Sequence, residues 1–207
     1  VEYQVPGYDG DEFGGLAGGE HFWKLDVTGT GRVALQADLT EFESGVYSYE
    51  IASGPMQFDG SRFTGTLRTQ TKQLKLVNST ASPLGAGWGL NGLIQLVEND
   101  DGSVLWIDGG GSELAFGPAT AAGQPLQSPP GDFSRLLKRP NGTYQQTMPD
   151  QAVYSFDDRH RIESKTDRNG NVWTYAYGAE GNLERVTDPT GLATRFLSLN
   201  GRIVEII

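Results

Sequence analysis

The sequence predicts an all-β protein with little helix, and three observations support this fold class. Glycine accounts for 29 of the 207 residues and proline for 10, so turns are dense, while aromatic residues reach 10% and can fill a core. Apolar and polar residues alternate over short segments that end in Gly, Asn or Asp. Windows longer than two helical turns lack helical periodicity. We therefore expect many short antiparallel strands.

Residues 1–75 are expected to form a leading β-rich domain that resembles a sandwich. The segments "HFWKLDV" and "RVALQADL" read as strands on either side of the turn "TGTG". The segment "SGVYSYEIA" places Val46, Ser48 and Glu50 on one face of a third strand and Tyr47 and Tyr49 on the other.

Residues 76–207 are expected to form a second β domain. The candidate strands "GLIQLVE", "SVLWID" and "ELAFG" are separated by "NDDG" and "GGGS", which are turns of the kind that close hairpins, so a three-stranded meander is predicted. Residues Ala119 to Asp132 carry three prolines and few branched apolar residues, which predicts a loop. Strand signals resume at "FSRLLKRP", "GTYQQTMP" and "QAVYSFD".

From residue 154 onward the sequence repeats itself with a period of 21 residues. Each copy contains aromatic residues and an Asp-x-x-Gly turn, in which Asp can bond to the backbone and Gly can take a positive φ. Because a lone hairpin is marginal in water, such hairpin repeats are expected to extend a sheet by adding onto their neighbours. The repeat positions that we expect to carry the structure are Tyr154, Asp167, Gly170, Tyr175, Tyr177, Asp188, Gly191 and Phe196.

Two further expectations concern the packing of these repeats. Tyr154, Tyr175 and Phe196 are expected to stack on neighbouring strands as an aromatic ladder, which adds about 0.5 to 1 kcal/mol per pair. His160 stands where the next copy has Gly181, so a histidine is placed at a turn position that favours positive φ.

The segments "YAYGAEGNLERVTDPTGLATRF", "SPLGAGWGLNGL" and "DGSVLWIDGGGSELAF" carry a family resemblance. Together with the flanking residues from about Leu39 to Ile207, they resemble the start of the repeat region in the Rhs or YD-repeat family. The Tyr-Asp signature is degenerate here, since Phe156-Asp157 keeps the Asp and Tyr177-Gly178 loses it.

This resemblance implies a β-sheet that spirals into a hollow shell. In polymorphic toxins and in toxin-complex C components of this family the shell encloses a C-terminal toxin, and in the related teneurins it is an adhesion scaffold. The resemblance therefore implies a non-enzymatic structural module of a large secreted bacterial protein, located outside the cell or at its surface. Its expected partners are the remainder of the same polypeptide and an enclosed toxin domain.

Two other classes of function stay open. The first is a cell-surface adhesion or carbohydrate-binding module that holds a glycan or a protein through exposed aromatic residues such as Trp23. The second is a hydrolase that uses dispersed carboxylates such as Asp108 and Glu113. Trp88, between two glycines, is expected to fill a core rather than to bind sugar.

Composition excludes several alternatives. The net charge of -10 and the absence of a dense Lys/Arg cluster argue against nucleic acid, and the apolar runs are too short to cross a bilayer. The chain has no cysteine, and His21 and His160 lie far apart, so neither a disulfide nor a local catalytic or zinc constellation is expected. No cofactor is expected, although a calcium ion at Asp9 to Glu12 remains an open alternative, and "ENDDGS" is assigned to a solvated turn.

The free strand edge near Ile203 to Ile207, "IVEII", is expected to associate with other edges because it is apolar and unpaired.

Overall fold

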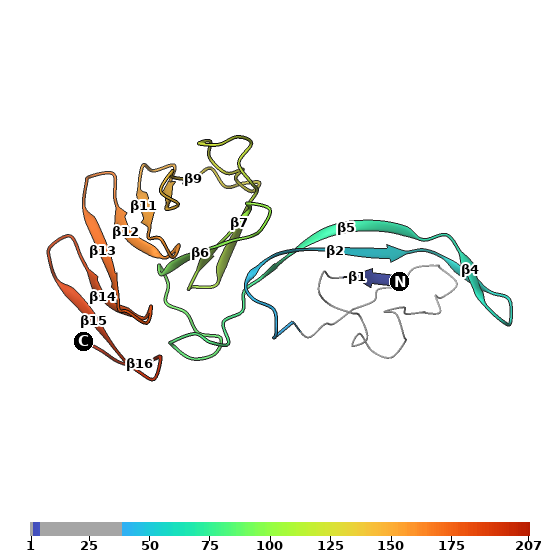
Figure 1. Ribbon diagram of the computed structural model, residues 1–207, viewed down its shortest axis with the longest axis horizontal. Coiled ribbons are helices and arrows are strands. Elements are labelled where there is room, and N and C mark those ends of the chain that lie inside the picture. The colour runs from blue at the N-terminus through green and yellow to red at the C-terminus, as the bar shows by residue number, and fades with distance from the viewer. Residues whose placement is uncertain (1, 5–38) are drawn as a thin grey trace. The chain divides into compact units, whose positions relative to one another are not determined.

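A computed structural model describes residues 2–4 and 39–207 of the protein. Every regular element in these residues is a β-strand, which confirms the all-β fold class (Figure 1). The segments "HFWKLDV" and "RVALQADL", as well as Asp9 to Glu12, His21 and Trp23, lie outside the described residues. The sandwich-like packing expected for residues 1–75 depends on these segments and stays a prediction.

The chain divides into two compact units. Unit 1 comprises residues 1–42 and 46–76, and unit 2 comprises residues 43–45 and 77–207. The domain boundary placed after residue 75 from the sequence remains a prediction, because compact packing alone does not show that either part folds independently.

The described residues of unit 1 form a three-stranded sheet and a hairpin. The sheet has the order β1-β2-β5, formed by β1 (Glu2–Gln4), β2 (Gly45–Ser53) and β5 (Arg68–Leu76). Strand β2 is the segment predicted from "SGVYSYEIA". The hairpin pairs β3 (Met56–Phe58) with β4 (Phe63–Gly65), and its turn is held by the Asp59 carboxylate, which accepts bonds from the N–H groups of Ser61 and Arg62.

Unit 2 begins with the predicted meander. The three strands β6 (Ile94–Glu98), β7 (Val104–Asp108) and β8 (Ser112–Phe116) pair antiparallel in chain order, and we call them the cover sheet. Between β8 and β9 the chain forms no regular strand, as expected from the prolines, and Gly117 forms an isolated bridge with Gln127.

The rest of unit 2 is one eight-stranded antiparallel sheet, which we call the repeat sheet. Its strands follow one another in space in the same order as along the chain (Figure 1). They are β9 (Arg135–Lys138), β10 (Tyr144–Thr147), β11 (Val153–Phe156), β12 (Ile162–Thr166), β13 (Val172–Tyr177), β14 (Leu183–Thr187), β15 (Ala193–Leu199) and β16 (Arg202–Ile206).

A β-bulge recurs in the repeat sheet with the period of the sequence. The register shifts between Ser155 and Phe156, between Ala176 and Tyr177, and between Leu197 and Ser198. On the partner strands the extra residues are Glu163, Glu184 and Val204, and all three are exposed. A bulge bends a strand and increases its twist, so each repeat introduces the same local bend.

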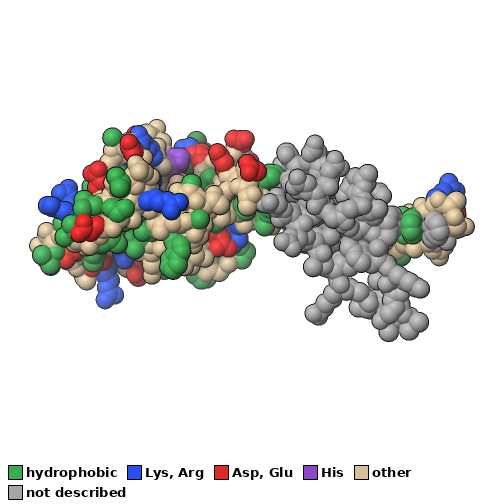
Figure 2. All heavy atoms as spheres, turned by 90° about the horizontal axis from the view of Figure 1, so that it is seen from below, with side chains coloured by type: hydrophobic (Ala, Val, Ile, Leu, Met, Phe, Trp, Pro, Cys, Tyr) green, Lys and Arg blue, Asp and Glu red, His purple; other side chains and the backbone are tan. Residues whose placement is uncertain are grey.

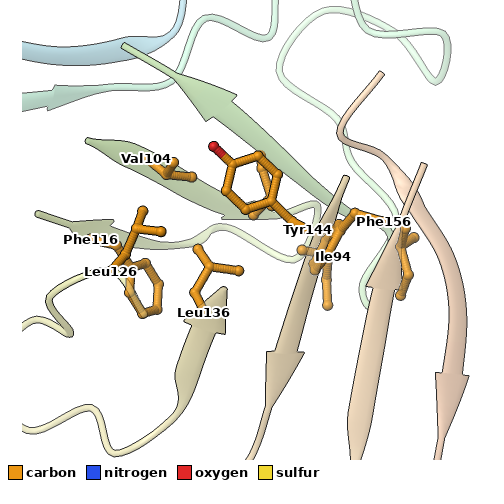
Figure 3. Close-up of a cluster of buried hydrophobic side chains, with 9 residues drawn as sticks. Ile94, Val104, Phe116, Leu126, Leu136, Tyr144 and Phe156 are labelled. Carbon is orange, nitrogen blue, oxygen red and sulfur yellow. The ribbon is translucent and has the colours of Figure 1, made fainter. Parts of the chain in front are cut away.

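The core of unit 2 lies between the cover sheet and the first strands of the repeat sheet. Two sets of buried apolar side chains meet there. One set comes from the cover sheet and the loop after it, and the other comes from the repeat sheet. The first set is Ile94, Leu96, Val104, Phe116 and Leu126, and the second is Leu136, Tyr144, Phe156 and Ile162. Figure 3 shows side chains from the two sheets converging on one cluster. Strand alternation explains this arrangement, because Ile94 and Leu96 in β6 are buried while Gln95 between them is exposed.

One buried polar network crosses this core. The Gln146 side chain is 1% exposed, its Oε1 accepts a bond from Trp106 Nε1 at 2.9 Å, and its Nε2 donates to Ser134 Oγ at 2.9 Å. The Ser134 hydroxyl is bonded in turn to Asp132. The polar atoms of Gln146 are therefore paired where an unpaired amide would be costly.

Candidate functional site

The repeated turns are the first feature of unit 2 that can carry a structural function. Seven hairpin turns in the described part of unit 2 close with two backbone bonds, one from the N–H of the fourth residue to the carbonyl of the first and one from the N–H of the first to the carbonyl of the fifth. This is a type I turn followed by a residue in the left-handed region. The fourth residues, all with positive φ, are Gly102, Gly142, Gln151, His160, Gly170, Gly181 and Gly191.

The Asp-x-x-Gly turns place the predicted repeat residues in this frame. Asp167 Oδ1 accepts the N–H groups of Asn169 at 2.8 Å and of Asn171 at 2.9 Å, while Gly170 has a φ of 85°. The hydrogen bond from the Asn171 side chain, together with these backbone bonds, lowers the pKa of Asp167.

The second Asp-x-x-Gly turn has the same geometry. Asp188 Oδ1 accepts the N–H groups of Thr190 at 2.8 Å and of Leu192 at 2.9 Å, and Gly191 has a φ of 91°. The Thr190 hydroxyl also donates to this carboxylate and is the main cause that lowers the pKa of Asp188.

His160 and Gln151 take the left-handed position without being glycine. Their φ values are 62° and 72°. His160 stacks edge-on against Tyr144, with ring centroids 5.0 Å apart, and its backbone oxygen accepts the N–H of Leu96 from the cover sheet. The histidine therefore lies at a point where the two sheets meet, and the unfavourable φ is offset by these contacts.

The prediction that aromatic residues of successive repeats stack on neighbouring strands is wrong. Tyr154, Tyr175 and Phe196 lie on β11, β13 and β15, which are separated by β12 and β14, so these residues do not pair with one another. A 21-residue period covers two strands and two turns, and equivalent positions are thus two strand spacings apart, about 9.5 Å.

A lysine side chain, rather than a third aromatic ring, lies between the aromatic residues of β11 and β13. Lys165 in β12 pairs with Tyr154 on one side and with Trp173 on the other. Its Nζ lies 5.6 Å from the Tyr154 ring centroid and 5.5 Å from that of Trp173. Both distances are within the range of cation–π attraction.

Tyr177 and Arg161 connect consecutive turns. The Arg161 guanidinium lies 4.0 Å from the Tyr177 ring, bonds to the Asp157 carboxylate at 2.7 Å and donates to the Gly181 carbonyl at 3.0 Å. The Tyr177 hydroxyl donates to Ile162 O at 2.9 Å. Burial raises the pKa of Tyr177, while the charge of Arg161 acts in the opposite direction.

Sequence reasoning did not find this function for Arg161. The signal was present as an acid and a base four residues apart across one turn, Asp157 and Arg161, with Tyr177 in the next strand. The contact does not recur one period later, because Gly178 and Asn182 occupy the equivalent positions.

A second polar cluster joins the cover sheet to the repeat sheet. Lys138 Nζ bonds to both oxygens of Glu98, at 2.6 and 2.8 Å, and His160 Nε2 lies 3.9 Å from the same carboxylate. Burial by itself would raise the pKa of Glu98, but the bonds from Lys138 and Tyr144 outweigh it and the pKa is lowered. Burial and the neighbouring Glu98 raise the pKa of Tyr144.

Trp88 borders a hollow of about 660 Å³ in unit 2. The expectation that Trp88 fills a core is wrong, since its side chain is 72% exposed. The close packing at this point involves Gly89 instead, because a Cβ on Gly89 would overlap the Gly109 backbone and a Cβ on Gly109 would overlap the Leu90 backbone. Glu113, Arg159 and Asn182 also line the hollow.

The carboxylates considered for hydrolysis do not form a pair. Asp108 lies opposite Ser112 and Glu113 lies opposite Ile107, so strand alternation places the two carboxylates on opposite faces of the cover sheet. Asp108 Oδ1 accepts the N–H of Gly92 at 2.7 Å.

In the acidic segment "ENDDGS", Asn99 and Asp101 bond to Ser103 within the turn, whereas Glu98 bonds to Lys138. Asp101 Oδ1 accepts the Ser103 N–H, and bonds from Ser103 lower the pKa of Asp101. Within residues 2–4 and 39–207, no group of three His, Asp or Glu side chains is arranged to hold a metal ion.

The described surface carries both signs of charge. On the face of unit 2 that Figure 2 shows, acidic and basic side chains are interspersed with hydrophobic ones. No helix in the described part of the chain is long and apolar enough to span a membrane.

Comparison with known proteins agrees with the repeat geometry. No curated protein matches the chain. Residues 156–194, which run from the end of β11 into β15, match a family model described as RHS Repeat. Because the match covers two Asp-x-x-Gly turns and the strands between them, the chain carries an RHS repeat, and its membership of the Rhs/YD-repeat family is supported over this segment.

Proposed function

We propose that this chain is a non-enzymatic structural module of a large exported bacterial protein, and that it builds a β-shell that encloses or scaffolds a C-terminal toxin domain. The observation that carries the proposal is the repeat sheet itself. Each strand pairs with the one before it, and the same bulge returns once per repeat. A sheet that is extended by identical bent steps grows into a curved wall.

The distribution of side chains supports a wall with two different faces. Phe156, Ile162, Leu183 and Phe196 are buried along the repeat sheet, while the three bulge residues are exposed. Leu199, Val204 and Ile206, at the far end of the repeat sheet, are exposed apolar residues, and the remainder of the polypeptide and the enclosed domain are their proposed partners.

The proposal assigns no catalytic function to this segment. His160 packs against Tyr144 and bonds through its backbone to the cover sheet, and the carboxylates Asp157, Asp167 and Asp188 accept bonds within their own turns. These contacts support structural functions for the polar residues of the repeats. An extracellular or cell-surface location is proposed from the similarity to RHS repeats.

The gene beyond the codon for Ile207 provides the first test. Further copies of the 21-residue repeat followed by a domain without repeats support enclosure. A reading frame that ends without such copies contradicts it.

Protease protection provides the second test, on the intact gene product. The domain that follows the repeats is expected to resist digestion in the wild type and to be cleaved in Gly191→Val, because Gly191 needs a φ of 91° that valine does not tolerate. Arg168→Ala, at an exposed turn position, is the matched control and is expected to retain protection. If the domain that follows the repeats is cleaved in the wild type as fast as in Gly191→Val, enclosure is contradicted.

A second candidate function is glycan binding at Trp88, supported by its exposure at the border of the 660 Å³ hollow. Exposed aromatic rings stack on sugar rings, and the neighbouring Glu113, Arg159 and Asn182 could bond to hydroxyl groups. On a glycan array the signal should disappear in Trp88→Ala and persist in Phe133→Ala, an equally exposed aromatic residue that does not line the hollow. A signal that survives in Trp88→Ala excludes this candidate.

A further inference from the structure

The chain contains four Asn-Gly dipeptides, and the structure distinguishes them chemically. They begin at Asn91, Asn141, Asn169 and Asn200. In such dipeptides the backbone nitrogen of Gly can attack the side-chain carbonyl carbon of Asn, because glycine has no Cβ to hinder the approach. The reaction requires a glycine N–H that is free to lose its proton and an Asn side chain that is free to turn.

At three of the four dipeptides the glycine N–H is already donated to an acceptor. The bonds are Gly92 N to Asp108 Oδ1 at 2.7 Å, Gly142 N to Arg139 O at 2.9 Å, and Gly170 N to Asp167 O at 3.1 Å. At Asn141 the side chain is held as well, since its Oδ1 accepts bonds from the N–H and the hydroxyl of Thr143 at 3.2 and 2.9 Å.

The fourth dipeptide differs from these three. Asn200 and Gly201 form the two-residue turn between β15 and β16, with φ values of 52° and 74°, as a type I′ hairpin turn requires. Both residues are exposed. Among the hydrogen bonds of the described residues, neither the Gly201 N–H nor the Asn200 side chain takes part in any.

We propose that Asn200 is the site at which this folded chain undergoes deamidation. The Gly201 nitrogen gives its proton to solvent base and forms a bond to Cγ of Asn200. The bond from Cγ to the side-chain nitrogen breaks, and ammonia leaves with a proton from solvent. Water then adds to one of the two carbonyls of the resulting succinimide and opens the ring to aspartate or isoaspartate.

The product changes the end of the repeat sheet. Isoaspartate inserts a methylene group into the main chain of a turn that has two residues between Leu199 and Arg202. The register that places Ser198 opposite Ile203 then no longer fits, and the bond from Ile203 N to Pro83 O at 2.8 Å depends on the same strand. Deamidation at Asn200 therefore loosens β16, the last strand in the order of the described repeat sheet.

The experiment follows all four dipeptides in the same sample. The folded chain is incubated in mildly alkaline buffer, and peptide mapping by mass spectrometry records the amide-to-acid conversion at each Asn, with isoaspartyl methyltransferase as an independent readout. Asn200 is expected to react at least about fivefold faster than each of the other three. At the other three sites one hydrogen bond of ~1 kcal/mol must first open, and this free energy corresponds to about a fivefold difference in rate.

Two controls separate structure from sequence. In urea the four rates should converge, because the bonds that protect Asn91, Asn141 and Asn169 are lost on unfolding. Asn200→Gly keeps the positive φ of the turn and should abolish methyltransferase labelling of the folded chain. Equal rates at the four sites in the folded chain, or faster reaction at any of the three bonded sites, would overturn the proposal, as would a folded chain in which Asn200 does not react.

Discussion

Gln146 is the residue whose replacement tests the packing between the cover sheet and the repeat sheet. Its buried amide bonds to Trp106 in β7 and to Ser134, both at 2.9 Å. Gln146→Leu conserves most of the volume and removes both bonds. Each bond contributes about 1 kcal/mol net, and leaving a buried donor without a partner adds to the cost, so unfolding should become easier by ~2 kcal/mol.

A double-mutant cycle identifies the Trp106 bond within this loss. Trp106→Phe removes the indole N–H, and the double variant Gln146→Leu with Trp106→Phe leaves no indole N–H to be orphaned. The two changes should therefore be less than additive by ~1 kcal/mol, as found for residues in direct contact.

Urea unfolding followed by far-UV circular dichroism measures each variant without relying on tryptophan fluorescence. Gln145→Leu is the matched control, because Gln145 is the preceding residue on β10 and points to the other face of the sheet. It should change stability by less than about 0.5 kcal/mol. A Gln146→Leu variant as stable as this control, or an additive cycle, would refute the assigned contribution of the buried amide.

Three further predictions concern other parts of unit 2. Gly109→Ala should lower the free energy of unfolding by about 1 to 3 kcal/mol, because its Cβ would overlap the Leu90 backbone. The Cβ of Gly117→Ala would meet only the Gln127 side chain, so this variant should lose less stability in urea unfolding, and equal losses would contradict the reasoning. The pKa of Asp188 is lower in the folded chain than in the unfolded chain, where it has its ordinary value near 4. The ionised carboxylate therefore stabilises the fold fully above that ordinary value, and this stabilisation is lost as the pH falls through the folded-state pKa. Acid unfolding of Asp188→Asn should depend less on pH in this range, and an unchanged curve would count against the Asp188 bonds. Val204→Lys should reduce self-association in light scattering, because Val204 is 63% exposed on the edge strand β16, and an unchanged particle size would argue against edge pairing.

Local sequence rules were sufficient for most strands and turns. The three strands of the cover sheet were predicted from alternating apolar and polar residues separated by the turns "NDDG" and "GGGS". Strands β9, β10 and β11 coincide with the strand signals in "FSRLLKRP", "GTYQQTMP" and "QAVYSFD". These features are decided within a few residues, by the pleat of a strand and by the φ that glycine permits.

The rules failed where a position depends on residues from another strand. The aromatic ladder was misplaced because the period was counted as one strand spacing when it covers two. Trp88 was assigned to a core from its flanking glycines, but of these Gly89 makes the close contact with Gly109 and Gly87 has a positive φ. Arg161 was missed because its partner carbonyl lies one repeat away, on Gly181.

The sequence by itself determined that the chain is built of β-hairpins with a 21-residue period, because turn chemistry and side-chain alternation are local properties. Tertiary structure decided where each repeat bends, which polar groups are paired across the core, and which of four identical Asn-Gly dipeptides has an unbonded glycine N–H. These outcomes depend on hydrogen bonds and packing between strands that are distant in sequence, and the identity of neighbouring residues does not specify them.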